Sequence, residues 1–264
     1  MRKYREIAKV FLKSQLAWRA DAVFNMIFTI SKILFAYLLW SVIFAEKERV
    51  AGFTFHGMLS YYIISSFLSQ LEMSDGISGE VCARIRNGTF SKYMILPVSI
   101  EGYFTAMEIG VVLFYLGFDL AAALVWVFIF RIEFVLVTDV LIWLCGLLLI
   151  VLGLFFMVQL NYYLGLLSLK YQGIETFLMI KRNFVELVTG SIVPLALFPE
   201  AVVSVMKVLP FYYVTYLPSM LFTGRLAGEA VPGVGIMVGW CLLMQVIIRL
   251  TWTRYSRKYD GVGI

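Results

Sequence analysis

Four charged residues lie inside long apolar runs of the sequence, at Lys32, Glu108, Asp119 and Glu186. A charge at the centre of a bilayer costs roughly 2.5–3.5 kcal/mol on insertion scales, so such side chains should face water or the interior of a helical bundle. Lys32 and Asp119 could form an ion pair. Alternatively, Glu108, Asp119 or Glu186 lines a substrate path or carries a proton. We favour structural pairing.

Residues for other chemistry are scarce. The chain has one histidine, His56, and three widely spaced cysteines. It contains no H-E-x-x-H pair for zinc and no G-x-x-x-x-G-K-[ST] loop for the phosphates of ATP. We therefore expect no catalytic residue, no metal site and no cofactor bound by this chain.

The composition indicates the class of protein. Hydrophobic residues make up 61% and charged residues 15%, and the mean hydropathy is +0.88. Lipid must be the solvent for so much apolar surface. We predict an all-α, polytopic membrane protein built as one domain over residues 1–264. The net charge of +5 reflects basic loops rather than nucleic-acid binding.

The apolar runs predict six transmembrane helices. Residues 1–20 form a basic amphipathic helix that lies in the membrane interface, and no cleavable signal peptide precedes the first span. Prolines break residues 194–225 into pieces too short to cross, which predicts an extracellular re-entrant segment. The spans are expected at about 22–45, 54–71, 100–130, 140–167, from 184 onward, and 234–252.

The basic residues predict the orientation. Sixteen of the 22 lysines and arginines fall on one side of this six-span arrangement, five fall on the other, and Lys32 lies within a span. The excess marks the cytoplasmic side. Both termini and the loop 72–101 are therefore expected in the cytoplasm.

The loop 72–101 is the longest polar interruption, and its pattern predicts a short helix. Asp75 is expected to cap that helix, and Gly88 to end it in a left-handed conformation. Ile77, Val81 and Ile85 form an apolar ridge, and Glu80 can pair with Arg84. The ridge either packs on the protein's own underside or inserts into a groove on a partner, with Arg84 and Arg86 at the rim.

Residues 77–99 read ISGEVCARIRNGTFSKYMILPVS. This stretch resembles the cytoplasmic coupling region of type-2 ATP-binding-cassette (ABC-2) exporter permeases, in a bacterial branch of about this length. The matching positions are Ile85, Arg86, Gly88, Phe90, Pro97, Val98 and Ser99. The basic leader helix, the six spans and the broken segment before the last span are similar to that branch as well.

The resemblance implies two permease halves, identical or different, on a dimer of cytoplasmic ATPases that bind ATP and magnesium. It favours the ridge as an ATPase contact, within a docking segment at 75–93. It also implies a bacterial cytoplasmic membrane and export of a hydrophobic or amphiphilic substrate. The alternatives are a substrate-binding component of a cassette-driven importer or, ranked last, an intramembrane enzyme.

Two further groups of residues carry predictions. Gly235 and Gly239 form a G-x-x-x-G pair that permits close helix approach and could mark a seam between subunits. Aromatic residues gather just before the last span and suit either an outer interface belt or a gate on the outer side. They are Phe211, Tyr212, Tyr213 and Tyr216.

Overall fold

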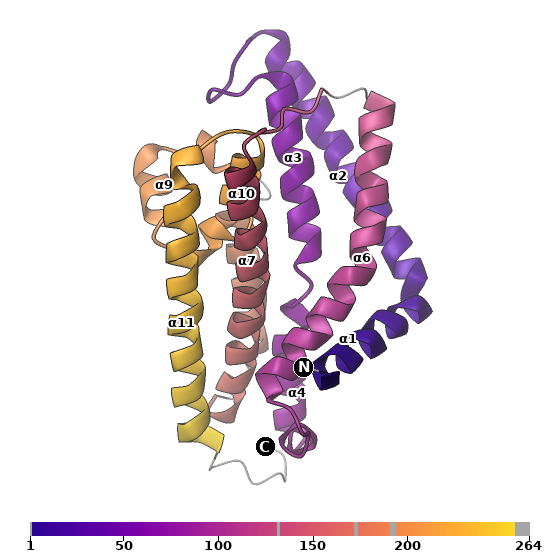
Figure 1. Ribbon diagram of the computed structural model, residues 1–264, viewed down its shortest axis with the longest axis vertical. Coiled ribbons are helices and arrows are strands. Elements are labelled where there is room, and N and C mark those ends of the chain that lie inside the picture. Colours follow the sequence, from indigo (N-terminus) through magenta and orange to yellow (C-terminus); the bar gives the residue numbers. More distant parts are fainter. Residues whose placement is uncertain (1, 131–132, 172–173, 191–193, 257–264) are drawn as a thin grey trace.

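The computed structural model describes residues 2–130, 133–171, 174–190 and 194–256, and these residues form an all-α protein (Figure 1). Short 3₁₀ turns connect several of the helices. The helices are α1 (Arg2–Gln15), α2 (Arg19–Ala45), α3 (Phe55–Leu71), α4 (Asp75–Arg86), α5 (Ser91–Met94), α6 (Ile100–Phe130), α7 (Val140–Leu166), α8 (Glu175–Val188), α9 (Glu200–Met206), α10 (Tyr216–Phe222) and α11 (Ala230–Tyr255).

Among the described residues, four helical stretches are long and apolar enough to cross a membrane: α1 with α2, α6, α7 and α11. A fifth is obtained if α9 and the segment Pro210–Phe222, which meet at 91°, count as one bent span. By this length criterion the described helices give four or five crossings, and the sixth crossing stays a prediction. The shortfall lies in α3, with 17 residues, and α8, with 14.

The fifth span is placed wrongly by the sequence pattern. Phe184, its expected start, lies in the middle of α8 rather than at its beginning. The polar residues before Phe184, read as a loop, form the first half of this helix. Lys181, whose charge indicated a loop, is buried within this helix. The local pattern was misleading because it does not show that this charge is buried.

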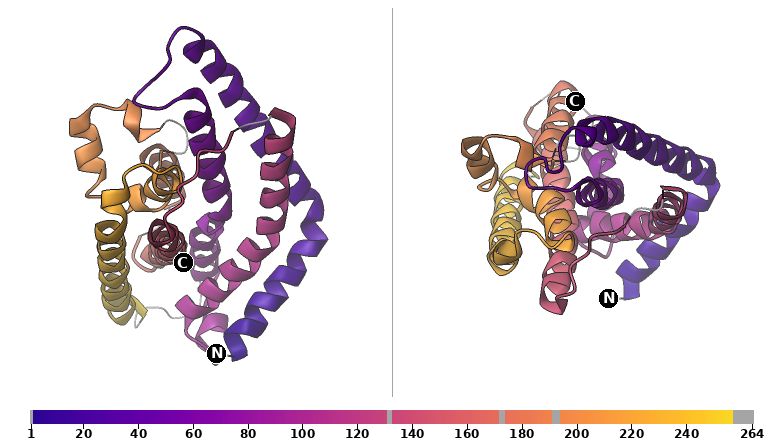
Figure 2. Two further views of the ribbon diagram at one scale, coloured as in Figure 1. Left: turned by 45° about the horizontal axis from the view of Figure 1, so that its top comes forward. Right: turned by 90° about the horizontal axis from the view of Figure 1, so that it is seen from above.

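The helices form two groups that meet along α3, α4, α6 and α7 (Figures 1 and 2). One group contains α1, α2, α3 and α6, and the other contains α7, α10 and α11. Helix α1 packs directly on α6 because Gly110 has no side chain there: a Cβ at Gly110 would overlap the carbonyl oxygen of Ala8. The start of α1, the end of α11 and α4 all lie at one end of the molecule.

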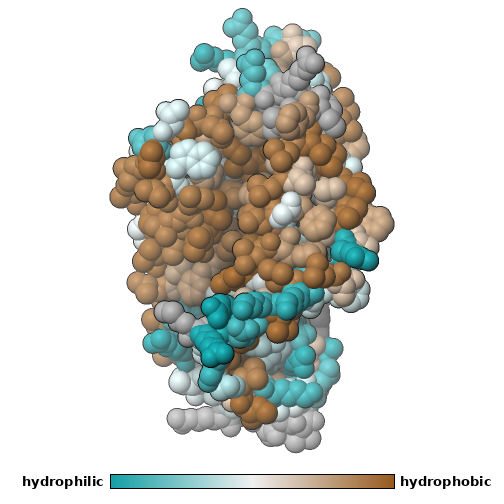
Figure 3. Space-filling model, turned by 45° about the vertical axis from the view of Figure 1, so that its right-hand side comes forward, coloured by the Kyte–Doolittle hydropathy of each residue, from teal (hydrophilic) through white to brown (hydrophobic). Residues whose placement is uncertain are grey.

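An apolar band covers the middle of the molecule. Figure 3 shows this band in brown on one face, with hydrophilic side chains in teal toward both ends. Large apolar side chains such as Phe28, Phe35 and Leu242 are exposed on the helices that carry it. A surface of this kind matches a protein surrounded by lipid.

The segment before α11 is broken as expected, with one difference. Pro199 and Pro210 separate short helices, but Pro218 lies in the first turn of α10 and does not interrupt it, because a first-turn proline loses no helical hydrogen bond. Tyr212, Tyr213 and Tyr216 are buried rather than placed at an outer interface. Their rings pack on one another, and the Tyr216 ring packs on that of Tyr61, so they form part of the core here, and a gating role stays a prediction.

The partly buried Phe211 contacts the rings of Phe156 and Phe184 and belongs to the same aromatic core. Gly235 and Gly239 face open space on the exposed side of α11. No described residue comes within 4 Å of a Cβ added at either glycine, and the role of this pair between subunits stays a prediction.

Candidate functional site

The apolar ridge of α4 packs on α7. Ile77, Val81 and Ile85 are all buried within the chain. The two helices meet at Gly165, where an added Cβ would lie 2.5 Å from the Cβ of Val81. The interpretation of this ridge as a partner contact is therefore corrected: it attaches α4 to the helical bundle, and only the other face of α4 is open to a partner.

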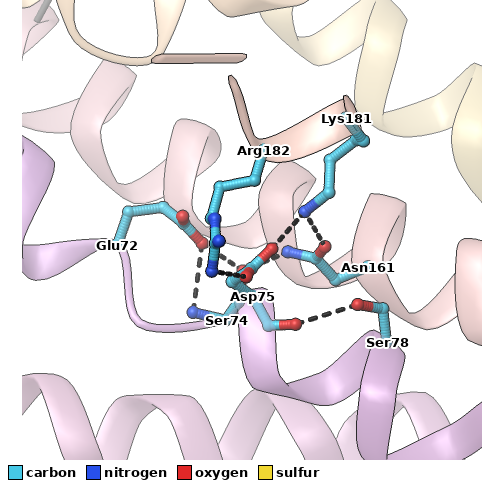
Figure 4. Close-up of polar contacts among 7 residues, drawn as sticks. All are labelled: Glu72, Ser74, Asp75, Ser78, Asn161, Lys181 and Arg182. Carbon is cyan, nitrogen blue, oxygen red and sulfur yellow. Dashed lines mark hydrogen bonds and ion pairs between the residues drawn. The ribbon is translucent and has the colours of Figure 1, made fainter. Parts of the chain in front are cut away.

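A polar network attaches the beginning of α4 to α7 and α8 (Figure 4). Asp75 does not cap the helix, because Ser74 is the N-cap residue and Asp75 is the first helical residue. The Asp75 carboxylate instead pairs with Lys181 of α8, and Arg182 lies 3.9 Å from its second oxygen. Asn161 of α7 accepts a hydrogen bond from Lys181 at 2.8 Å and donates one to Ser74 Oγ at 2.8 Å.

The burial of a charged side chain in this network has to be compensated. The Lys181 side chain is only 8% exposed, whereas that of Asp75 is 40% exposed. A buried ammonium is tolerated when hydrogen bonds and an opposite charge compensate for its lost hydration. Lys181 obtains both, from Asn161 and Asp75, and these two residues belong to different helices. The ammonium therefore links α4, α7 and α8 at one point.

Two carboxylates fix the joint between α3 and α4. Glu108 of α6 accepts a hydrogen bond from the backbone N–H of Met73 at 2.9 Å, and Glu72 accepts one from the backbone N–H of Ser74 at 3.1 Å. Burial raises the pKa of the Glu72 carboxyl, while the hydrogen bonds from Ser74 act in the opposite direction. The backbone at this joint is thus held from both α3 and α6.

The end of α4 is tied to α5 and α11. Arg84 donates from Nε to Glu80 at 2.5 Å, as the four-residue spacing predicts, and the Tyr93 hydroxyl donates to the same oxygen at 3.0 Å. Gly88 takes a positive φ of 70°, which confirms the predicted left-handed end. Phe90 is buried against Tyr93 and Trp252, so its place in the site is structural.

The surface left open beside α4 contains apolar side chains that the ridge pattern overlooked. Ile95 is 83% exposed and Met94 is exposed next to it, at the end of the molecule opposite the loop 46–54. Arg86 and Pro97, which flank α5 in the sequence, are exposed as well, and the Pro97 carbonyl accepts a hydrogen bond from Lys3. This surface, formed by Arg86, Met94, Ile95 and Pro97, is called the α4–α5 surface below.

Of the four charged residues within apolar runs, two are buried and two are exposed. Glu108 and Asp119 are buried, as expected. Lys32 and Glu186 are exposed on this chain and lie within electrostatic reach of each other. Within the described residues no ion pair joins Lys32 to Asp119, so the suggested pairing is wrong. Asp119 lies instead between α2 and α3, beside Thr29 and Ile63.

The contacts of this site connect helices to one another. Among the described residues, no group of three or more histidine, cysteine, aspartate or glutamate side chains could hold a metal ion. The residues that link the helices include several that the loop pattern missed, above all Asn161 and Lys181. A polar amide in the apolar run 140–167 was the signal that could have identified Asn161.

Comparison with known proteins places the chain in a family. A family model described as "ABC-2 family transporter protein" matches residues 30–263. No curated protein and no solved structure matched. The match spans every helix from the second half of α2 to α11 and agrees with the polytopic helical fold. The chain belongs to the ABC-2 family of transporter proteins, as a multi-pass membrane permease.

Proposed function

We propose that this permease is the membrane subunit of an ATP-driven exporter, whose energy comes from a separate cytoplasmic ATPase that docks on the α4–α5 surface. The observation that carries the proposal is that α4 is fixed to the bundle on one face while an exposed apolar surface lies next to it. One face is fixed to α7 and α8 through Gly165, Asn161 and Lys181. Beside it, Ile95 is exposed at an end of the molecule that the charge pattern assigns to the cytoplasm.

A docking surface needs apolar side chains to bury and polar residues around them. Ile95 and Met94 supply the apolar part, and Arg86 and Lys92 supply positive charge at the edge. A force applied to this surface reaches α8 through the Asp75–Lys181 pair and α7 through the buried ridge. The network thus explains how a partner outside the bundle moves helices inside it.

A second permease subunit, identical or different, is expected to cover the face that carries Lys32 and Glu186. Both side chains are exposed on this chain, and Lys32 lies in the middle of the 27-residue helix α2. Charges at this depth are rarely exposed to lipid. Another subunit or a water-filled path between the subunits would solvate them. A hydrophobic or amphiphilic substrate, moved from the cytoplasm or inner leaflet, suits such a path.

Copurification tests the docking surface. Candidate ATPases are those encoded beside the gene for this chain, and each is coexpressed with the tagged permease. Ile95→Glu should abolish ATPase recovery, because a charge would replace the most exposed apolar side chain of the surface. Leu136→Glu is the matched control, since Leu136 is an exposed apolar residue in the connection between α6 and α7 at the opposite end. Full ATPase recovery with Ile95→Glu would refute docking at this surface.

A further inference from the structure

A continuous groove runs along α6, α7 and α11, away from the Lys32 face. It consists of three adjoining cavities of about 560, 480 and 360 Å³. The first two share Glu101, Gln245 and Arg249 in their walls. The second and third share Thr105, Ile109 and Phe155. Shared walls join the three cavities from the end of the molecule that bears α4 to the middle of α6.

The groove is polar at one end and apolar at the other. Near α4 its walls carry Glu101, Gln245 and Arg249, with Trp252 at the edge. Farther along, between α6 and α7, the walls are mostly apolar, and Thr105 and Glu108 are the polar residues among them. Leu113 and Val151 there are exposed, so the slot opens sideways toward lipid. An occupant must therefore be amphiphilic, with its polar part at headgroup depth, where tryptophan is also favoured.

The polar end presents two opposite charges that do not neutralise each other. Glu101 and Arg249 line the same two cavities, yet no ion pair within 4.0 Å joins them among the described side chains. The carboxylate of Glu101 is held in place because its oxygens accept hydrogen bonds from Gln159 at 3.1 Å and Gln245 at 2.8 Å. A headgroup that carries both a phosphate and a cation would complement this pair.

We propose that the groove binds a phospholipid with an ethanolamine headgroup, taken from the leaflet at the α4 end. The phosphate contacts Arg249, because guanidinium groups bind phosphate oxygens strongly. The primary ammonium contacts Glu101, and one acyl chain lies in the slot between α6 and α7. This lipid site goes beyond the transport role, and its test needs no ATPase, so either proposal can fail while the other stands.

Lipid retention by the full-length permease in detergent tests the site. Phosphatidylethanolamine, phosphatidylcholine and phosphatidylglycerol with the same acyl chains are titrated separately and followed by native mass spectrometry. The ethanolamine lipid should bind most tightly, because choline has no N–H donor for Glu101 and the glycerol lipid has no cation. Arg249→Gln should weaken its binding about tenfold, the loss expected for one charge-assisted contact.

Matched controls separate this site from general lipid binding. Arg254→Gln removes the same charge from the same helix, but Arg254 does not line the groove, so binding should be unchanged. Leu113→Trp should fill the slot and weaken binding, whereas Leu242→Trp on the exposed side of α11 should not. Glu101→Gln should remove the preference for ethanolamine over choline.

Three results would overturn the proposal. They are equal affinity of the unmodified protein for the ethanolamine and choline lipids, tighter binding of the glycerol lipid, and undiminished binding by Arg249→Gln.

Discussion

Lys181 illustrates how a single side chain can connect three helices. Its ammonium group is buried in α8, and its hydrogen-bonding partners come from α4 and α7. Removing one partner of a fully buried ion pair costs roughly 3–5 kcal/mol, because a charge is then left without compensation. Here the cost is smaller, since the Asp75 side chain is partly exposed and water can replace some of what is lost.

The first prediction concerns this pair. Asp75→Asn should lower the unfolding free energy by about 1–3 kcal/mol, because the buried Lys181 ammonium loses the opposite charge of Asp75. Combining it with Lys181→Met should restore part of that loss, since the buried charge is then gone. Thermal unfolding of the purified permease measures both. Arg182→Gln is the control: Arg182 is exposed and lies 3.9 Å from Asp75, so this substitution should have little effect. If the effects of Asp75→Asn and Lys181→Met simply add in the double variant, the two residues are not coupled.

At the scale of the helices, much of the fold follows from the sequence. The apolar run 100–130 coincides with α6, and the Ser99 hydroxyl accepts a hydrogen bond from the backbone N–H of Gly102 at its start. The length of this run and its high content of apolar residues were sufficient to predict the helix. For α8, length and apolar content did not predict the helix, because its buried Lys181 is stabilised by residues 20 and 106 positions away in the sequence. No local pattern contains such partners.

The coupling loop shows the same limit. Its helix and its ion pair between Glu80 and Arg84 were predictable, because both depend on residues four positions apart. What the apolar ridge packs against was not predictable. Periodicity indicates an apolar face but does not say what covers it. The exposed side chains that replace the ridge as a docking candidate, Met94 and Ile95, lie beyond the helix and follow no helical spacing.

The second prediction tests the contact between α4 and α7. Gly165→Ala should destabilise the protein by about 1–3 kcal/mol, because the new methyl group overlaps Val81 and the helices must separate. Gly79→Ala is the control within α4. Nothing lies within 4 Å of an added Cβ there, so alanine should be neutral or stabilise the helix by up to about 1 kcal/mol. Equal melting temperatures for the two variants would mean that the close approach at Gly165 contributes no stability.

At the scale of the whole molecule, orientation in the membrane links the fold to the proposed function. Helix α4, the start of α1 and the end of α11 share one end, and the loop 46–54 lies at the other (Figure 1). The excess of basic residues predicts that the α4 end is cytoplasmic. An ATPase can reach α4 only in that orientation.

The third prediction is a labelling pattern. In intact cells, a membrane-impermeant maleimide should label Glu48→Cys, in the exposed connection between α2 and α3, and should not label Lys92→Cys. Lys92→Cys should react only after the membrane is opened, because the predicted orientation places α5 on the cytoplasmic side. The reverse pattern would invert the topology and exclude ATPase docking at α4.

The central claim is that ATPase motion enters the bundle through α4 and the buried Lys181. Lys181→Met tests it in the assembled complex, because the substitution leaves the α4–α5 surface intact and the partly exposed Asp75 solvated. The measurement is the ATP hydrolysis rate of the reconstituted complex relative to that of the ATPase alone, with Arg182→Gln as control. We expect Lys181→Met to retain the ATPase and to lose most of the rate change that the permease produces. A rate change equal to that of the unmodified complex would contradict the claim.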